Sequence, residues 1–401
     1  MVEKIEIERL PIQIIDGDRG KNYPHQNELL EKGDCLFLSA KNVTSNGFLF
    51  TEKQFITADK DALLRNGKLC RGDIVITTRG TVGNVAYYDN DVPFENVRIN
   101  SGMLIVRCNN SICREYVYNV LRSDSFLTQI KSIQTGSAQP QLPKSHFLKM
   151  KIPVPELDVQ KKVAGIIGDI DKKIAINTKI NNNLEQQAEA LFHSLFVGNA
   201  NPTWKDGVLS DLGTIVAGGT PSKSKPEYYS EHGIAWITPK DLSLNKSKFI
   251  SHGEIDISEL GFSKSSATKM PAGTVLFSSR APIGYIAIAA NEVTTNQGFK
   301  SVVPNENIGT AFMYYLLKFL LPTIEGMASG STFKEISGAG MKTVPVVIPD
   351  NMTIEKFNSF CTPIFQQQEV LESENSQLAD IRDALLPKLM SGEIDVSNTD
   401  L

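Results

Sequence analysis

Lys68-Leu-Cys-Arg-Gly-Asp-Ile-Val-Ile-Thr-Thr-Arg-Gly-Thr-Val-Gly-Asn-Val-Ala86 is matched later in the chain by Lys269-Met-Pro-Ala-Gly-Thr-Val-Leu-Phe-Ser-Ser-Arg-Ala-Pro-Ile-Gly-Tyr-Ile-Ala287. In both stretches an apolar run leads to a pair of hydroxyl side chains and an arginine, and a glycine stands four residues after the arginine. Such a run, bounded by glycine and polar residues, predicts a strand that ends in a polar turn. The repetition predicts that one structural unit occurs twice.

The correspondence continues beyond these stretches. Gly136-Ser137 matches Gly330-Ser331, Val154-Pro155 matches Ile348-Pro349, and a long segment with helical periodicity follows each proline. A repeat of this length is too long for a solenoid, whose units run to about 50 residues, so we expect a pseudo-twofold pair of domains. The predicted divisions are a globular domain at 1–155, a helical spacer at 156–200, a second globular domain at 201–349, and a second helical spacer with a C-terminal tail at 350–401.

Each globular domain has the pattern of a small sheet. Short apolar runs alternate with Gly, Asn and Asp, as in Asp73-Ile-Val-Ile-Thr and Thr274-Val-Leu-Phe-Ser. Such runs predict short strands joined by tight turns, and a helical pattern follows them at about 114–132 and 309–326. We therefore expect the α+β class, with a mixed, mostly antiparallel sheet in each of two domains that are separated by long helices.

The two spacers carry apolar residues at alternating steps of three and four, as the seam of a coiled coil requires. Asn177, Asn181 and Asn375 interrupt the seam, and a buried polar residue can fix the register of paired helices. We expect the helices to pack on each other as an antiparallel coiled coil, with their remaining faces free for partners. The alternative is two independent amphipathic helices, each of which covers its own domain.

Composition describes a globular chain with an expected cytoplasmic location. The five cysteines are scattered and form no Cys-x-x-Cys pair, which is typical of a reducing compartment. The sequence has no N-terminal signal region and no apolar run long enough to span a bilayer, so no membrane contact is expected. The net charge of −4 is unusual for a protein that binds nucleic acid, but the acidic excess falls within 350–401.

Motifs of independent chemistry are missing from the sequence. It contains no Gly-x-x-x-x-Gly-Lys-Ser/Thr loop, no His-Glu-x-x-His metal pair, and no Asn/Asp-Pro-Pro-Tyr/Phe of the kind that aminomethyltransferases use on a flipped base. We therefore expect no catalytic residue and no metal ligand. One alternative is a self-sufficient nuclease, for which Asp16 and Asp18 form the compact acidic candidate. The other is a scaffold that binds only protein.

Taken in order along nearly the whole chain, these features resemble the specificity subunit of type I restriction–modification systems. The resemblance rests on the two-unit architecture, the Arg-x-x-x-Gly element in each domain, Gly218-Gly-Thr-Pro, Trp236-Ile-Thr-Pro-Lys-Asp-Leu, and Leu385-Leu-Pro-Lys-Leu-Met-Ser-Gly-Glu-Ile. It implies that each globular domain is a target-recognition domain that reads one half-site of a bipartite double-stranded DNA target. Because the domains differ outside the shared motifs, the half-sites should differ too.

The resemblance also implies partners and cofactors. The helices would fix the gap between the half-sites and dock two methyltransferase subunits, and a translocase–nuclease subunit would join for restriction. S-adenosylmethionine, ATP and magnesium would belong to those partners, so this chain would hold no cofactor and perform no catalysis. The seam positions expected to serve docking are Ile167, Ile174, Leu184, Leu191, Ile364, Leu371, Leu378 and Leu385.

Candidate DNA contacts follow from the chemistry of base recognition, in which arginine and lysine bind guanine, amides bind adenine, and hydroxyls hold phosphates. Arg280 is the only arginine within 205–349, and the repeat places it opposite Arg79, so both are predicted to touch DNA. The alternative for each is a structural arginine paired with a carboxylate, and for the polar loops an ordinary turn. The further candidates are Asp16, Asp18, Arg19, Lys21, Lys41, Asn42, Thr77, Thr78, Ser137, Gln139, Gln141, Thr220, Ser222, Lys223, Lys240, Ser278, Ser279, Ser331 and Lys334, with Asn100 and Gln297 as weaker candidates.

Overall fold

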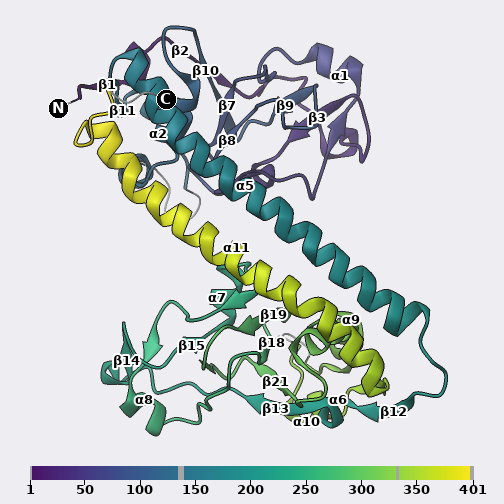
Figure 1. The fold of residues 1–401 in the computed structure, drawn as a ribbon. Coiled ribbons are helices and arrows are strands. Elements are labelled where there is room, and N and C mark those ends of the chain that lie inside the picture. The colour runs from purple at the N-terminus through teal and green to yellow at the C-terminus, as the bar shows by residue number, and fades with distance from the viewer. Residues whose placement is uncertain (1, 134–139, 331–333, 398–401) are drawn as a thin grey trace. The chain divides into compact units, whose positions relative to one another are not determined.

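The computed structural model describes residues 2–133, 140–330 and 334–397, and the chain divides into two compact units. Unit 1 comprises Met1–Ile174 and Gln377–Leu401, and unit 2 comprises Ala175–Ser376. Two long helices, α5 (Leu157–His193) and α11 (Asn351–Ser391), each contribute one part to unit 1 and the other part to unit 2 (Figure 1). Each unit is therefore a globular domain together with a segment of both helices.

The main sheet of unit 1 has the strand order β2-β10-β7-β8, and all its neighbours are antiparallel. A second sheet has the order β6-β3-β9, in which β3 and β9 are parallel. Two short pairs, β1 with β11 and β4 with β5, complete the sheets of this unit. The bounds are β1 Lys4–Glu6, β2 Ile12–Asp16, β3 Cys35–Leu38, β4 Val43–Thr44, β5 Gly47–Phe48, β6 Phe55–Ile56, β7 Ile74–Thr77, β8 Val85–Tyr87, β9 Val97–Ile99, β10 Met103–Cys108, β11 Lys151–Pro153, α1 Ala58–Leu63, α2 Arg114–Leu121, α3 Asp124–Ile133 and α4 Lys144–Leu148.

The main sheet of unit 2 has the order β13-β21-β18-β19-β16, with β16 parallel to β19 at one edge. Three short pairs surround it: β12 with β22, β14 with β17, and the parallel pair β15 with β20. The bounds are β12 Lys205–Val208, β13 Gly213–Ala217, β14 Tyr229–Ser230, β15 Trp236–Ile237, β16 Phe249–Ile250, β17 Asp256–Ile257, β18 Val275–Ser279, β19 Ile283–Ala289, β20 Thr294–Thr295, β21 Lys300–Pro304, β22 Pro345–Ile348, α6 Leu209–Leu212, α7 Pro239–Leu244, α8 Glu259–Ser263, α9 Thr310–Met327 and α10 Gly338–Lys342.

The main sheets of the two domains share four strands in the same order, as the repeat predicts. β2, β7, β8 and β10 of unit 1 correspond to β13, β18, β19 and β21 of unit 2, and α2 corresponds to α9. The repeated glycines have a backbone reason: Gly72 and Gly273 have φ of 91° and 83°, and Gly83 and Gly284 both have φ of 95°. L-residues with a side chain rarely adopt this region, so both copies of the turn require glycine. The predicted α+β class with two domains is confirmed.

The long helices belong to the domain cores. In unit 1, Val163 and Ile167 of α5 and Leu389 of α11 pack with the apolar face of the main sheet and with α2 and α3. In unit 2, Phe192 of α5 and Phe357 of α11 pack with α9 and the main sheet. Each helix segment therefore covers its own domain, as the alternative of two amphipathic helices predicts. This packing removes much of the apolar surface of the helices from solvent.

The helices also contact each other. In unit 2, Asn177 donates a hydrogen bond to Asn375 at 3.0 Å, and Asn181 donates one to Glu372 at 3.3 Å. Residue numbers fall on α11 as they rise on α5, so the segments run antiparallel. In unit 1, Arg382 of α11 donates a hydrogen bond to Asp171 of α5 at 3.1 Å. Polar seam residues thus bind one another, while the coiled-coil geometry of the pair stays a prediction.

Candidate nucleic-acid interface

Arg79 and Arg280 occupy matched positions at the ends of β7 and β18. The backbone of Arg79 bridges to Gln141, and the backbone of Arg280 bridges to Glu335. On the other side, Thr78 and Ser279 donate their backbone N–H groups to the carbonyls of Gly102 and Gly298, at 2.7 Å each. Each arginine therefore leaves its strand between two fixed segments, and its place is set by main-chain bonds that do not depend on side chains.

The hydroxyl side chains that precede the arginines lie inside the domains. Thr77 and Ser278 are fully buried, and each accepts a hydrogen bond from a backbone N–H of the following turn, from Asn84 at 3.0 Å and from Tyr285 at 2.7 Å. Ser279 donates to the Gly298 carbonyl at 3.1 Å, and Thr78 is 4% exposed. Thr77, Ser278 and Ser279 therefore have no surface to offer a phosphate, and their hydroxyl groups hold the turn beneath each arginine. Thr78 is nearly buried and reaches the surface only where it lines the cavity described next.

Unit 1 has a polar cavity of about 300 Å³ at this position. It brings together five of the predicted residues, and Arg19 in it is bound to Asp16 at 3.1 Å with half of its side chain exposed. The guanidinium of Arg79 binds no other group among the residues that the structure describes. The lining comprises Asp16, Arg19, Thr78, Arg79, Leu104, Gln141, Leu142, Pro143, Lys144 and Ser145.

The other described candidates of unit 1 do not line this cavity. Asp18 is buried and accepts hydrogen bonds from the backbone N–H of Gly20 and of Arg65, both at 2.7 Å. Burial would raise the pKa of Asp18, but these backbone donors outweigh burial and hold its pKa below the ordinary value. Asn42 is also buried and bonds the Leu49 and Glu52 carbonyls. Lys41 pairs with Glu52 at 2.9 Å, and Lys21 is exposed.

The guanidinium of Arg280 forms an ion pair, whereas that of Arg79 forms none with the residues that the structure describes. The Glu335 carboxylate lies 3.3 Å from the Arg280 guanidinium and 3.7 Å from the Lys300 amine. Burial lowers the pKa of Lys300, while the negative charge of Glu335 opposes that shift. Sequence reasoning selected Lys334 in this loop and missed Glu335 and Lys300. The repeat contained the signal for Glu335, because it matches Gln141 in the first domain.

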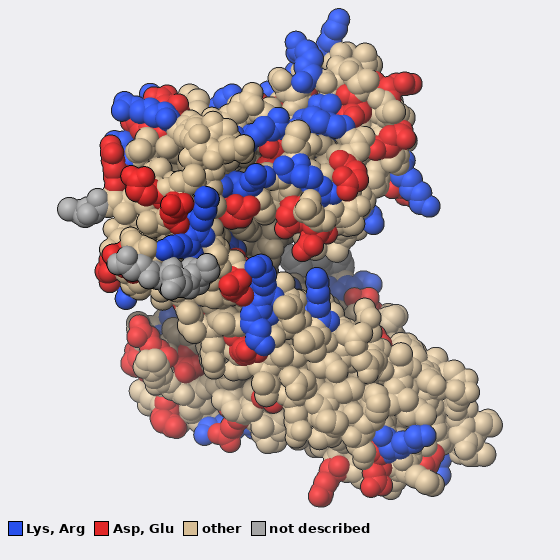
Figure 2. Space-filling view, turned by 45° about the horizontal axis from the view of Figure 1, so that its top comes forward, with Lys and Arg blue, Asp and Glu red and all other residues tan. Residues whose placement is uncertain are grey.

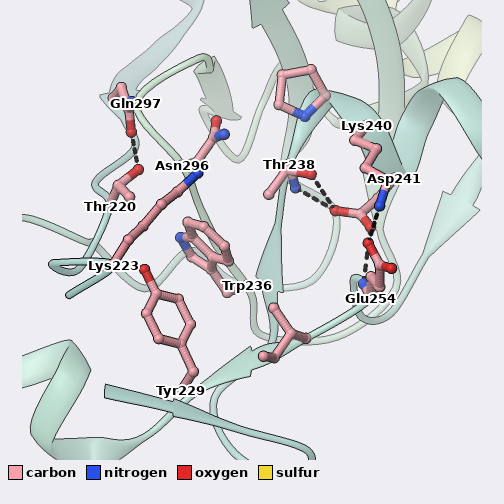
Figure 3. A pocket seen from close by; sticks show the side chains of 12 residues that line it. Thr220, Lys223, Tyr229, Trp236, Thr238, Lys240, Asp241, Glu254, Asn296 and Gln297 are labelled. Atoms are coloured by element: carbon pink, nitrogen blue, oxygen red, sulfur yellow. Dashed lines mark hydrogen bonds and ion pairs between the residues drawn. The ribbon is translucent and has the colours of Figure 1, made fainter. Parts of the chain in front are cut away.

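A second cavity, of about 520 Å³, lies in unit 2. Its lining includes Thr220, Lys223 and Lys240 of the predicted set, and Gln297 of the weaker candidates. Figure 3 shows Trp236 near its centre, with Tyr229 beside it. On one side of the tryptophan lie Thr220, Lys223, Asn296 and Gln297, and on the other lie Thr238, Lys240, Asp241 and Glu254. The cavity joins an aromatic wall to groups that form hydrogen bonds, which is typical of a recognition site.

The free groups of this cavity are donors. Gln297 accepts a hydrogen bond from Thr220, and Asn296 accepts one from the Gly298 backbone at 2.8 Å, which leaves both amide NH₂ groups without a partner among the described residues. Lys223 is exposed, whereas Lys240 is paired with Glu254. Ser222 is exposed and shares a hydrogen bond with Ser224. Asn100 of unit 1 makes the same turn as Asn296, since it accepts from the Gly102 backbone.

The face of the molecule drawn in Figure 2 carries charges of both signs. On the face in Figure 2, lysine and arginine side chains are interspersed with carboxylates and do not form one continuous basic area. This agrees with the net charge of −4.

None of the predicted docking residues is fully exposed. Ile167, Ile364 and Leu371 are buried in the units, and the other five are half-buried. Residues beside the seam are the exposed ones, and sequence reasoning missed them because it assigned the apolar seam to partners. The exposed apolar side chains of the two helices are Ile176, Ile180, Met352, Phe360, Val370 and Ile381.

Some expectations meet the limits of the described chain. Ser137, Gln139 and Ser331 lie outside the described residues. Within 2–133, 140–330 and 334–397, no group of three or more His, Cys, Asp or Glu side chains is placed to hold a metal ion. Over the same ranges, no helix combines the length and the apolar character needed to cross a membrane.

The chain belongs to the family of type I restriction–modification DNA specificity domains, whose model matches it twice, at residues 13–186 and 201–372. The first match contains Arg79, and the second contains Arg280. The family accounts for the repeat, because each copy of the family model spans most of one recognition domain and more than half of the helix that follows it.

Several relatives are similar to this chain. The type I restriction enzyme MjaIX specificity subunit of Methanocaldococcus jannaschii is 35% identical over 191 residues, which are 47% of this chain and 43% of that protein. The HindI specificity subunit of Haemophilus influenzae is 25% identical over 94% of this chain and 98% of its own. Among solved structures, the type I restriction–modification S subunit from M. genitalium has a TM-score of 0.60 at 17% identity, and the match covers 96% of this chain and 95% of the other. That likeness shows the fold.

Proposed function

We propose that this chain reads a split, asymmetric sequence in double-stranded DNA, with one domain for each half-site, and that it performs no catalysis of its own. The observation that carries the proposal is the pair of matched arginines with unlike neighbours, Gln141 beside Arg79 and Glu335 beside Arg280. A reading site is defined by its neighbouring donors and acceptors, so the two domains would select different bases.

The cavity of unit 1 has the groups for direct base recognition. The guanidinium of Arg79, which has no partner in the described part of the chain, suits the O6 and N7 acceptors of guanine. The amide of Gln141 suits the N6 and N7 atoms of adenine. Arg19 is bound to Asp16, and half of its side chain is exposed. Its guanidinium can therefore reorient towards a phosphate without any rearrangement of the core.

Unit 2 would read its half-site with a different set. Arg280 is bound to Glu335 and must exchange that carboxylate for a base or phosphate. The free amide donors of Asn296 and Gln297 suit base acceptors, and the Lys223 amine suits a phosphate. The wall of Tyr229 and Trp236 adds apolar surface.

The partners in this proposal are modification subunits. Exposed apolar residues of the helices, such as Ile180 and Val370, give them a surface to bind, because such side chains gain stability when a partner covers them. Two methyltransferase subunits would bring S-adenosylmethionine, and a translocase–nuclease subunit would bring ATP and magnesium. This chain would then contribute the choice of sequence and no cofactor.

The test is to purify this chain with its co-expressed methyltransferase subunit and to select binding sequences from random duplex DNA. The expected result is two unlike short motifs at one fixed spacing. A stable protein complex that enriches no sequence would favour the scaffold alternative. Magnesium-dependent cleavage of DNA by this chain alone would favour the nuclease alternative.

A further inference from the structure

Lys248 connects the second recognition domain to both long helices. It directly precedes the edge strand β16, and its side chain is almost completely buried, with the residue 7% exposed. The amine donates to the Glu185 carboxylate on α5. It also donates to the side-chain amide oxygen (Oε1) of Gln368 on α11 at 2.6 Å. One side chain of the sheet edge thus binds two different helices at the same point.

The main chain and the surrounding rings reinforce this contact. The Glu372 carboxylate on α11 accepts hydrogen bonds from the backbone N–H groups of Lys248 at 3.0 Å and Phe249 at 3.1 Å. The Lys248 amine also lies 4.3 Å from the centre of the Phe365 ring. From α9, Lys318 binds the same Glu185 at 2.8 Å. The edge of the sheet is therefore held by directional bonds rather than by apolar packing alone.

A buried cluster of this kind is demanding in geometry. Charges taken out of water cost free energy that their partners return only in one good arrangement, and a partly satisfied network is worse than an apolar contact. An apolar residue in place of Lys248 could pack in several orientations. The lysine, in contrast, permits the orientation in which Glu185 and Gln368 are both in reach.

Unit 1 has one part of this arrangement. Tyr118-x-x-x-Arg122 matches Tyr314-x-x-x-Lys318, and each cation lies over its tyrosine, at 4.8 Å and 5.7 Å from the ring centre. Arg122 binds Asp171 on α5, just as Lys318 binds Glu185. Lys248 has no counterpart, because the main sheet of unit 1 ends at β8 and no strand among the described residues takes the place of β16.

We propose that Lys248 is a positioning residue that fixes the angle at which the second recognition domain is held on the two helices, and thereby the number of base pairs allowed between the half-sites. The inference rests on the proposed function. Lys248 itself does not reach DNA, since it is buried between the sheet edge and the helices. Its loss should alter the spacing between the motifs and leave the motifs themselves unchanged.

The experiment compares Lys248→Met with the wild-type chain, each co-purified with the methyltransferase subunit, in the random-duplex selection. The wild type should yield one spacing. The variant should yield the same two motifs spread over at least two spacings, with affinity for the wild-type spacing reduced roughly three- to tenfold because the domain is no longer held in advance. Lys246→Met is the matched control, because Lys246 is exposed in the same domain, and it should keep one spacing.

A second variant guards against misfolding. Gln368→Leu breaks the same contact from the side of α11 and should broaden the spacing in the same way. Thermal unfolding of each variant shows whether it is folded. If both motifs persist at one unchanged spacing in the folded variants, or if the second motif changes, the positioning role is wrong while the proposed function stands. If the wild type yields no motif, the proposed function itself fails.

Discussion

The guanidinium of Arg280 and the carboxylate of Glu335 lie 3.3 Å apart at the end of β18, where the matching residues of unit 1 are Arg79 and the uncharged Gln141. The second domain therefore presents its arginine already bound to an internal anion. In the proposed mode of binding, DNA would have to displace this carboxylate from Arg280 or bind despite its repulsion. Among the described residues of the first domain, no carboxylate is bound to Arg79, so the proposed contact of Arg79 with DNA would need no such exchange.

Glu335→Gln should strengthen DNA binding. The substitution removes the anion that competes for Arg280 and Lys300, so we expect affinity to rise about three- to tenfold at low salt and the salt dependence of log K to steepen by about one. Fluorescence anisotropy of a labelled duplex between low and moderate salt measures both. Glu306→Gln, at an exposed position of the same domain, is the control. Equal or weaker binding by Glu335→Gln would mean that the carboxylate orients Arg280 for DNA.

Arg79→Ala and Arg280→Ala should each relax a different motif. An arginine that binds guanine through two hydrogen bonds contributes about 1–3 kcal/mol to discrimination against other bases, so one position of one motif should lose most of its preference. Selection from random duplex DNA reports both motifs at once. Arg9→Ala, a largely exposed arginine of unit 1, should alter neither. A loss of both motifs in a single variant would indicate unfolding or a shared site.

Trp236 offers a direct signal for the cavity of unit 2. The chain has two tryptophans, so Trp204→Phe leaves Trp236 as the sole one. Trp204 donates a hydrogen bond to Asp350 at 2.8 Å, and its loss should cost about 1 kcal/mol of stability without unfolding the domain. In this variant, a duplex with the second motif should change the tryptophan emission, and one with only the first should not. Trp236→Phe should abolish the response. An unresponsive Trp236 alongside tight binding would place the DNA elsewhere.

Glu185 should make the stability of unit 2 sensitive to acid. Burial opposes ionisation of this carboxyl, but the cations of Lys248 and Lys318 outweigh burial and lower its pKa from 4.5 to about 2. Because the pKa of the folded state is the lower one, the stabilisation is present above pH 4.5 and is lost as pH falls towards 2. The shift corresponds to roughly 3 kcal/mol.

The measurement is the free energy of unfolding in denaturant, followed by circular dichroism at pH 7, 5 and 3. The difference between the wild type and Glu185→Gln should be largest at pH 7 and should shrink at pH 3. Glu355→Gln, which removes an exposed carboxylate of α11, should show a small difference that is constant with pH. A difference for Glu185→Gln that does not vary with pH would contradict the lowered pKa.

The architecture was predictable because the repeat includes its own structural reasons. Gly72 and Gly273 recur since both turns need a positive φ, and Arg79 and Arg280 recur since both strands end at the same main-chain bridge. Residues that the same backbone conformation requires occur once in each domain, so the repeat can be recognised in a single sequence without an alignment. The cavity of unit 1 gathered several of the predicted residues for the same reason.

The rest depends on which way side chains point. Thr77 and Ser278 read as polar candidates, yet the pleat turns them inward, where the following turn needs a hydroxyl acceptor. Lys248 resembles a surface lysine, and only the packing of two distant helices on β16 makes it a buried cation. Ile167 fits a docking seam, but its own domain covers it. These outcomes follow from tertiary contacts that periodicity does not encode.

Unit 1 is assembled from both ends of the sequence, with Leu386, Leu389 and Met390 of α11 in the same core as the strands β7 and β10. On the ribosome, those three residues emerge only after the whole of unit 2 has been made. The core of the first domain therefore stays incomplete during synthesis of the second domain. The second domain, in contrast, is formed from one continuous stretch of chain. A premature stop codon in α11 before Leu386 would leave every candidate DNA contact of the first domain intact and still deprive that domain of the side chains that close its core.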